Sequence, residues 1–166
     1  KTVRTAEPKF VPEEAVEVSL GDGATVSVRL IDSVGYMVKG AMGQFEDGQP
    51  RMVMTPWFED EIPMAEAAEI GTRKVITEHS TIGIVVTTDG SITDIDREDY
   101  IEPEDRVIQE LKELGKPFIV LLNSEEPTSQ RAQSISQEIS KKHGVACMPI
   151  NCLTLNEQDI KNILQA

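Results

Sequence analysis

Hydrophobic and polar residues alternate over residues 15–20 and 25–31, which predicts two β-strands that each bury one face. Gly21-Asp22-Gly23 lies between these segments and suits the left-handed backbone of a tight turn. The two segments therefore predict a β-hairpin whose second strand ends at Asp32. A stretch rich in glycine and proline follows over residues 33–61, and a loop of that length in a compact domain is usually functional or mobile.

The remaining hydrophobic pattern switches between short apolar runs and helical periodicity. Three runs have the length and composition of strands that are covered on both faces, namely residues 81–87, 118–122 and 145–150. Between them, apolar residues recur at spacings of three and four, which predicts helices. The predicted helices span residues 63–78, 103–114 and 128–143, and a last helix is capped by Asn156.

This order of elements predicts an α/β fold with a mostly parallel sheet and helices on both faces. The hairpin is expected to add an antiparallel strand at one edge. The length of 166 residues and the 39% hydrophobic content fit a single domain over residues 1–166 with its own core. Only 4% of the residues are aromatic, so that core is expected to be mainly aliphatic.

The charge balance limits the classes of partner. The chain has 16 basic and 29 acidic residues, a net charge of −13, which repels phosphate backbones and predicts no nucleic-acid binding. No segment approaches the ~20 consecutive apolar residues of a membrane span. Cys147 and Cys152 lack the spacing of a redox pair and are expected to be free thiols in a reducing cytoplasm.

Polar residues follow each predicted strand, where parallel sheets collect their ligands. Asp32 ends the hairpin and Gly35 follows it, Thr88-Asp89-Gly90 ends the next strand, and Asn123 and Asn151 follow the last two. Each signal alone is weak, because polar turns at strand ends are common. An aspartate in this place, followed by glycine, is typical of nucleotide-hydrolysing domains. The carboxylate lies beside Mg²⁺ and the glycine lets the backbone approach a γ-phosphate.

In this order, the elements resemble P-loop nucleoside triphosphatases of the GTPase-like class. Asp32-Ser33-Val34-Gly35 resembles their DxxG element, which contacts Mg²⁺ and the γ-phosphate. Asn123 resembles the first residue of their NKxD element, which reads the base, and Asn151 takes the place of the last base-side loop. The lysine that stacks on guanine is Ser124 here, and the aspartate that pairs with guanine is Glu126. Because hydrogen-bond readout depends on side-chain length, these departures favour adenine or loose base selection.

Long sequence words match one family closely: TAEPKFVP from Thr5, DSVGY from Asp32, TPWF from Thr55, EAAEIGTRKVI from Glu66 and TTDG from Thr87. Together they resemble the stage IV sporulation protein A family of endospore-forming bacteria over essentially the whole chain. The resemblance implies a cytoskeleton-like ATPase that uses ATP and Mg²⁺ and polymerises with itself. It also implies a place on the outer forespore membrane surface, in the mother-cell cytoplasm. There the family forms the base layer of the spore coat, with other coat proteins and membrane-anchoring proteins as partners.

The same resemblance assigns roles to individual residues. It makes Asp32 the Walker B-type carboxylate that coordinates Mg²⁺ directly or through water. Thr5 matches a threonine that senses the γ-phosphate in the family. The family often has two adjacent threonines in this segment, and in this chain the second of them is replaced by Ala6. The family's Walker A loop would lie before Lys1, and its membrane-targeting end would lie after Ala166. These 166 residues alone are therefore expected not to turn over ATP.

The missing Walker A segment also has a structural consequence. In GTPase-like sheets, its strand lies between the hairpin strand that ends at Asp32 and the strand at residues 81–87. Without it, two inner edges are unpaired, which is a liability for a sheet. We expect residues 1–12 or another chain to fill this gap.

Several alternatives stay open at this stage. The chain is either part of an ATPase, a non-catalytic interaction module on the same fold, or a regulatory GTPase, against which Ser124 argues. Trp57 either anchors a neighbouring subunit or packs under its own loop. Arg73 and Lys74 either reach a phosphate in an adjacent subunit or, as is commoner, are solvated and ion-paired.

Overall fold

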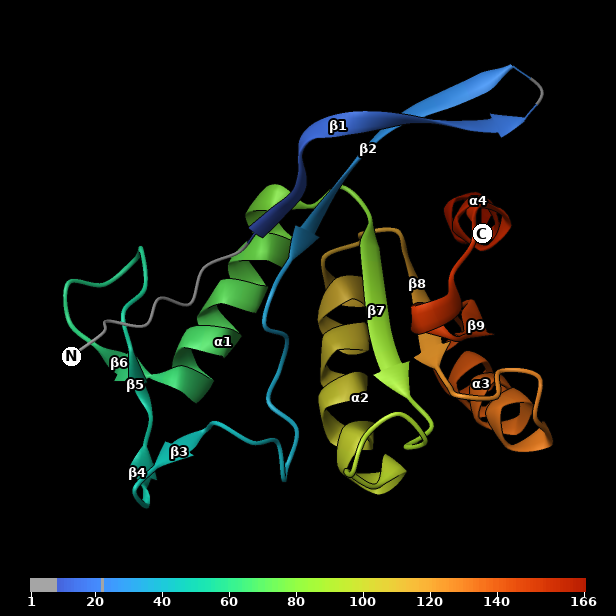
Figure 1. The fold of residues 1–166 in the computed structure, drawn as a ribbon. Helices are drawn as coiled ribbons and strands as arrows, with labels where there is room; N and C mark the ends of the chain where they lie inside the picture. Colours follow the sequence, from blue (N-terminus) through green and yellow to red (C-terminus); the bar gives the residue numbers. More distant parts are fainter. Residues whose placement is uncertain (1–8, 22) are drawn as a thin grey trace. The chain divides into compact units, whose positions relative to one another are not determined.

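The computed structural model of the protein describes residues 9–21 and 23–166. The chain falls into two compact units, each described here by itself (Figure 1). The first comprises residues up to 15 together with 29–80, and the second comprises 16–28 together with 81–166. Both strands of the hairpin run through both units, so the division does not follow a single linker in the sequence.

A three-stranded parallel sheet forms the centre of the second unit. Its order is β7-β8-β9, with β7 at Gly83–Thr88, β8 at Phe118–Asn123 and β9 at Cys147–Ile150. These strands begin and end within two residues of their predicted positions. The prediction of an α/β fold with a parallel sheet is confirmed. The register places Thr88 level with Asn123, so the residues that follow these two strands also lie level with each other.

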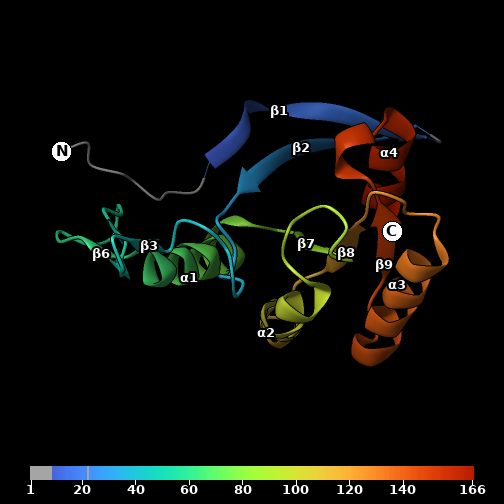
Figure 2. The ribbon, with the colours of Figure 1, turned by 60° about the horizontal axis from the view of Figure 1, so that its bottom comes forward.

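Helices cover both faces of this sheet (Figure 2). On one face, α2 (Arg97–Glu113) packs against β7 and α3 (Gln130–His143) packs against β9. On the other face, Ile163 of α4 (Glu157–Gln165) packs against Ile119 and Leu121. Because strand side chains alternate between faces, β8 is buried on both sides, which explains its uninterrupted apolar sequence.

Side-chain and glycine caps define several of the helix ends. Asn156 accepts hydrogen bonds from the backbone of Gln158 and Asp159, so the predicted cap of α4 is confirmed. Gly144 ends α3 with a φ of 64°, a backbone conformation that favours glycine. The start of α2 was predicted at Pro103, but the helix begins at Arg97. Acidic residues suit its first turn, and an internal proline removes only one backbone hydrogen bond.

The first unit contains α1 (Met64–Lys74), which continues into a π-helical turn over Val75–His79. The long loop before α1 is partly ordered by two small antiparallel pairs. The first joins β3 (Phe45–Glu46) to β4 (Gln49–Pro50), and the second joins β5 (Met52–Val53) to β6 (Ile62–Pro63).

Trp57 packs against α1 of its own chain. A Cβ atom built at Gly71 would lie 3.1 Å from Cη2 of the indole, so the absence of a side chain at this position admits the ring. The Nζ atom of Lys74 lies 5.8 Å from the indole centroid and 3.3 Å from a carboxylate oxygen of Glu78. Packing within its own chain is therefore the arrangement seen for Trp57, and Lys74 is ion-paired.

The hairpin is longer than predicted, with β1 at Lys9–Gly21 and β2 at Ala24–Asp32. It forms a two-stranded sheet of its own rather than an edge of the parallel sheet. Most of its side chains are exposed, as in a ribbon without a second layer over it. Residues 9–12 belong to β1, so they do not fill the predicted gap, and residues 1–8 lie outside the described part of the chain.

Among the described strands, β7 pairs only with β8. Its other edge therefore has no strand partner in this part of the chain. Ile84 and Val86, which share one face of β7, are 40% and 58% exposed, although aliphatic side chains in a covered sheet are normally buried. No described strand fills the gap beside β7, and its filling by residues 1–8 or by another chain stays a prediction.

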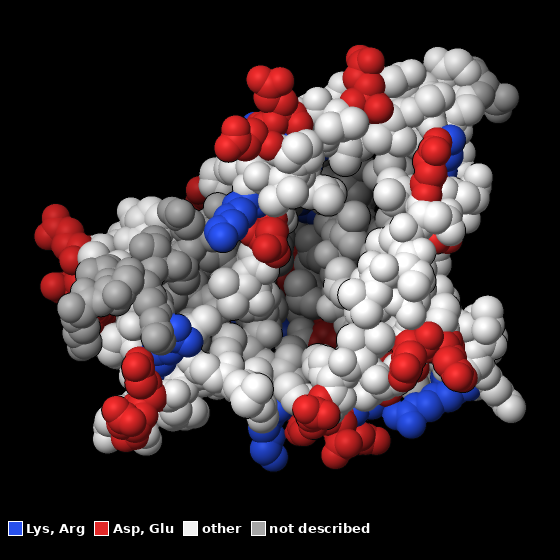
Figure 3. Space-filling model, viewed as in Figure 1, with Lys and Arg blue, Asp and Glu red and all other residues white. Residues whose placement is uncertain are grey.

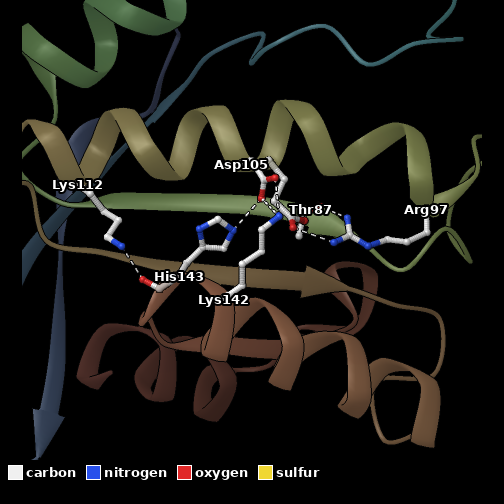
Figure 4. A network of polar contacts seen from close by, with 7 residues as sticks. Thr87, Arg97, Asp105, Lys112, Lys142 and His143 are labelled. Carbon is white, nitrogen blue, oxygen red and sulfur yellow. Dashed lines mark hydrogen bonds and ion pairs between the residues drawn. The ribbon is translucent and has the colours of Figure 1, made fainter.

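A polar clamp joins α2 to the end of α3 (Figure 4). The two carboxylate oxygens of Asp105 lie 2.6 and 2.7 Å from Nζ of Lys142, and one of them lies 2.8 Å from Nε2 of His143. Lys112 donates to the carbonyl of His143 at 2.7 Å. Partial burial opposes ionisation of Asp105, but the hydrogen bonds and charges of Lys142 and His143 outweigh it and lower the pKa of that carboxyl.

We expect Asp105→Asn to destabilise the protein by about 1 kcal/mol at pH 7, because the substitution removes the charge at the centre of this partly exposed clamp. A carboxyl group whose pKa is lower in the folded state stabilises the fold at pH values above its ordinary pKa of 3.8. This stabilisation is lost as the pH falls through the folded-state pKa. The difference between variant and wild type should therefore shrink towards zero in strong acid. Urea unfolding over a pH series measures it.

Glu157→Gln is the matched control, because Glu157 is exposed and its ion pair with Lys161 joins neighbouring turns of the same helix. It should leave the urea midpoint unchanged. Equal midpoints for Asp105→Asn and wild type at pH 7 would show that the clamp does not stabilise the fold.

Candidate functional site

The candidate site is the set of loops at the carboxyl ends of β7, β8 and β9. These loops begin at Asp89, Ser124 and Asn151, and they lie at one edge of the sheet because the strands are parallel. Polar contacts join each loop to its neighbour.

Asp89 joins the first two loops. Its Oδ1 atom accepts hydrogen bonds from the backbone and the hydroxyl of Ser91, at 3.0 and 2.6 Å, and its Oδ2 atom accepts one from the Ser124 hydroxyl at 2.6 Å. The register explains the contact with Ser124, because Thr88 and Asn123 are level and the next residue of each strand continues that pairing. Asp89 and Ser124 are both buried.

The two serine hydroxyls extend the contact into the backbone of the second loop. The Ser91 hydroxyl accepts from the amide of Glu125 at 2.9 Å, and the Ser124 hydroxyl accepts from the amide of Glu126 at 3.2 Å. Arg131 of α3 donates to the carbonyl of Asp89 at 2.9 Å. We call Asp89, Ser91, Ser124 and Arg131 the Asp89 clasp.

The clasp holds Asp89 ionised. Burial opposes the charge, but the hydrogen bonds from Ser124 and Ser91 and the positive charge of Arg131 outweigh burial, so the pKa of Asp89 is lowered. An ionised carboxylate makes shorter and stronger hydrogen bonds than a neutral one, in agreement with the two hydroxyl contacts of 2.6 Å.

Two asparagines join the second loop to the third. Oδ1 of Asn123 accepts from the amide of Cys152 at 2.9 Å, and Nδ2 of Asn151 donates to the carbonyl of Glu125 at 3.3 Å. Oδ1 of Asn151 also accepts from the amide of Leu153 at 3.0 Å, which starts a short 3₁₀ turn. The three loops therefore form one hydrogen-bonded edge.

A buried ion pair lies just below this edge, between α2 and β7 (Figure 4). Arg97 donates to the Thr87 hydroxyl at 3.3 Å and to Oε1 of Glu104 at 2.8 Å. Oε2 of Glu104 is buried and has no hydrogen-bond partner among the described residues. The ion pair lies within α2, and the hydrogen bond from Arg97 to Thr87 attaches the N-terminal turn of α2 to the end of β7, the far end of the loop that begins at Asp89.

The structure brings together four of the residues predicted to bind nucleotide, which are Asn123, Ser124, Glu126 and Asn151. Asn123 and Asn151 bind the backbone of neighbouring loops, and Ser124 binds Asp89. Their predicted contacts with a nucleotide stay predictions.

The residues predicted for the phosphate and metal side belong to the first unit. Asp32 is the last residue of β2 and is exposed, and Gly35 has a φ of 78°, which favours glycine over other residues. Thr5 lies outside the described residues. One accessible carboxylate fits Mg²⁺ in nucleotide sites, where the ion uses few protein ligands besides phosphates and water. The roles of Asp32, Gly35 and Thr5 also stay predictions.

The sequence placed Asp89 in a turn, among the polar residues at the carboxyl ends of the strands, but it assigned no role to Asp89 and did not single out Ser91 or Arg131. The local signal for Asp89 was Asp-Gly-Ser after a buried strand, which also describes a common turn. Its distinguishing partner, Ser124, is 35 residues away, and only the strand register relates the two.

Other kinds of site find little support in residues 9–21 and 23–166. In this part of the chain, no three His, Cys, Asp or Glu side chains gather as a metal centre would require. Cys147 and Cys152 are free thiols, and burial raises the pKa of each, so neither is activated as a nucleophile.

A parallel α/β sheet with flanking helices and polar residues at the carboxyl ends of its strands is consistent with a P-loop-like domain. Within that class, one family can be identified. The model of the family "Stage IV sporulation protein A, ATPase domain" matches residues 1–166, and the chain belongs to this family.

Relatives with the same name are found in several bacteria. The chain is 52% identical to stage IV sporulation protein A of Bacillus subtilis (strain 168) over 165 residues, which is 99% of this chain. It is 50% identical to that of Clostridioides difficile (strain 630) over 166 residues and 49% identical to that of Bacillus anthracis over 165. The chain spans about a third of the length of these relatives, 34% of each. No solved structure matches the chain.

We expect Asn123→Ala to loosen the third loop, because the amide of Cys152 loses its acceptor. The cost of one such hydrogen bond is about 1 kcal/mol, which is about a fivefold faster amide exchange at Cys152 if that amide exchanges through local opening. Hydrogen–deuterium exchange measures this. Gln158→Ala, which removes an exposed contact with Asn162 within α4, should leave exchange at Cys152 unchanged. Unchanged exchange at Cys152 in Asn123→Ala would contradict the linkage of the loops.

Proposed function

We propose that the intact protein is an ATP-hydrolysing scaffold that polymerises with itself and forms the base layer of the spore coat. The observation that carries the proposal is the match of the whole chain to the ATPase domain of a sporulation family. Its relatives at 49–52% identity all bear the name stage IV sporulation protein A, which supports a role in sporulation.

ATP is the proposed nucleotide. GTPase-like proteins place a lysine against guanine at the position of Ser124, and here a short side chain is buried and bound to Asp89. It therefore offers no long side chain for stacking on guanine. Glu126 stands where those proteins have the aspartate that pairs with guanine. Both departures favour adenine or loose base selection.

Asp32 and Thr5 are the proposed residues on the phosphate side, with Asp32 holding Mg²⁺ directly or through water and Gly35 allowing the backbone close to the γ-phosphate. Mg²⁺, when bound, neutralises charge on the phosphates. The phosphate loop is proposed to come from polypeptide outside these 166 residues, together with a strand that completes the sheet beside β7. The unpaired edge of β7 and its exposed Ile84 and Val86 support this.

We place the protein in the mother-cell cytoplasm, at the outer forespore membrane surface, with itself, other coat proteins and membrane-anchoring proteins as partners. Among the described residues, no helix combines the length and apolar character needed to cross a bilayer. Contact with the membrane is proposed to run through regions outside this chain, as the family resemblance implies. On the face in Figure 3, basic side chains lie beside acidic ones in small groups, which disfavours a nucleic-acid partner.

Asp32→Ala in the intact protein should lower ATP hydrolysis at least about 100-fold, because it removes the carboxylate that is proposed to hold Mg²⁺ against the phosphates. Steady-state phosphate release measures the loss, and circular dichroism checks that the fold is kept. Glu17→Ala is the matched control, because it removes an exposed acidic residue from the other strand of the same hairpin.

Normal turnover in Asp32→Ala would reject the role of Asp32. The same assay with wild type separates the three classes of function. Hydrolysis of ATP in preference to GTP supports the proposal, preference for GTP favours a regulatory GTPase, and no hydrolysis of either favours a non-catalytic module.

A further inference from the structure

The Asp89 clasp is more extensive than a turn requires. An aspartate that accepts the amide two residues ahead stabilises a local turn, and the bond from Ser91 to Asp89 is of this kind. The remaining bonds are not local. Ser124 reaches Asp89 from 35 residues away, and Ser91 binds the Glu125 amide across a separation of 34 residues. The clasp therefore fixes a second loop, the one that follows β8.

The two serine hydroxyls of the clasp both bind the backbone of the loop that follows β8. The amides of Glu125 and Glu126 each bind a serine hydroxyl, and each of these hydroxyls in turn donates to the Asp89 carboxylate. An ionised acceptor fixes the direction of both hydroxyl protons, because a carboxylate only accepts hydrogen bonds. The serine oxygens are thereby left to accept from the two amides.

The surroundings of Asp89 hold it away from a ligand. The residue is 3% exposed and Ser124 is 1% exposed. The carboxylate already accepts three hydrogen bonds, from the Ser91 backbone, the Ser91 hydroxyl and the Ser124 hydroxyl. A group in this position acts on a ligand through the loop it holds and does not contact the ligand itself.

We propose that Asp89 is a positioning residue for nucleotide binding, which sets the 123–126 loop in its binding conformation before the nucleotide arrives. The proposal rests on the function proposed above, in which this loop faces the base. A loop that is ordered in advance binds more tightly, because the ligand does not have to supply the free energy of ordering. Loss of the clasp should thus weaken nucleotide binding and leave the chemical step unchanged, since the clasp holds the loop proposed to face the base, and the residues proposed for the phosphate side are Asp32, Gly35 and Thr5.

Ser91 offers the sharpest test, because its side chain is exposed and substitutions there need not disturb the core. Ser91→Ala removes the hydroxyl that links Asp89 to the amide of Glu125, and Ser91→Thr keeps it. Asp89→Asn removes the charge and keeps the shape. Asp94→Asn is the matched control, because it removes an exposed acidic group from the same loop.

The experiment measures KM and kcat for ATP in the intact protein that carries each substitution. We expect KM to rise about 5- to 10-fold in Ser91→Ala and Asp89→Asn, the effect of losing about one charge-assisted hydrogen bond. We expect kcat to stay within about twofold, and Ser91→Thr and Asp94→Asn to match wild type. A merely structural role would not separate KM from kcat. Recovery in Ser91→Thr would show that the hydroxyl, and not the size of the side chain, carries the effect.

Three results overturn the proposal, and they are distinguishable from one another. Wild-type hydrolysis of ATP together with an unchanged KM in both Ser91→Ala and Asp89→Asn overturns the positioning role alone. A fall in kcat without a rise in KM does the same. Failure of the wild-type intact protein to bind or hydrolyse ATP overturns the proposed function and the positioning role with it.

Discussion

The burial of β8 on both faces is the constraint on which the second unit depends. Val120 and Leu122 are fully buried, and on the other face Ile119 and Leu121 pack under α4. A strand covered in this way must place its polar residues beyond its ends, because an unpaired polar group inside would cost several kcal/mol, on the order of 2–7. Asn123 and Ser124 therefore appear at the point where β8 leaves the core. The polar edge is a consequence of the buried strand.

The sheet and its helices could be predicted from the sequence because burial on both faces leaves uninterrupted apolar runs. The cap at Asn156 was also readable, since its partner Asp159 is three residues away. The start of α2 was misread because Pro103 is equally at home in a first helical turn, and the acidic residues before it looked like a loop. A structural feature could thus be predicted where neighbouring residues specify it, as at Asn156. It could not be predicted where the same residues fit two structures, as before Pro103.

The candidate site was predictable only in part for a related reason. Asn123 and Asn151 were recognised because each directly follows a strand. The link between Asp89 and Ser124 was missed, because it depends on the register between β7 and β8, which periodicity within either strand does not specify. Asp32 and Gly35 rest on motif resemblance, and they belong to a different compact unit from the polar edge.

Parallel pairing also governs how this unit folds. Val85 pairs with Val120, so the first contact between β7 and β8 closes a loop of 35 residues, the difference between these two positions. No hairpin shortens this path, since parallel strands require a crossover. The entropy of closing this loop must be lost before the sheet gains a strand pair, whereas α2 and α3 form from neighbours in sequence. The sheet contacts of this unit are thus non-local and its helical contacts local, so strand pairing is expected to form more slowly than the helices.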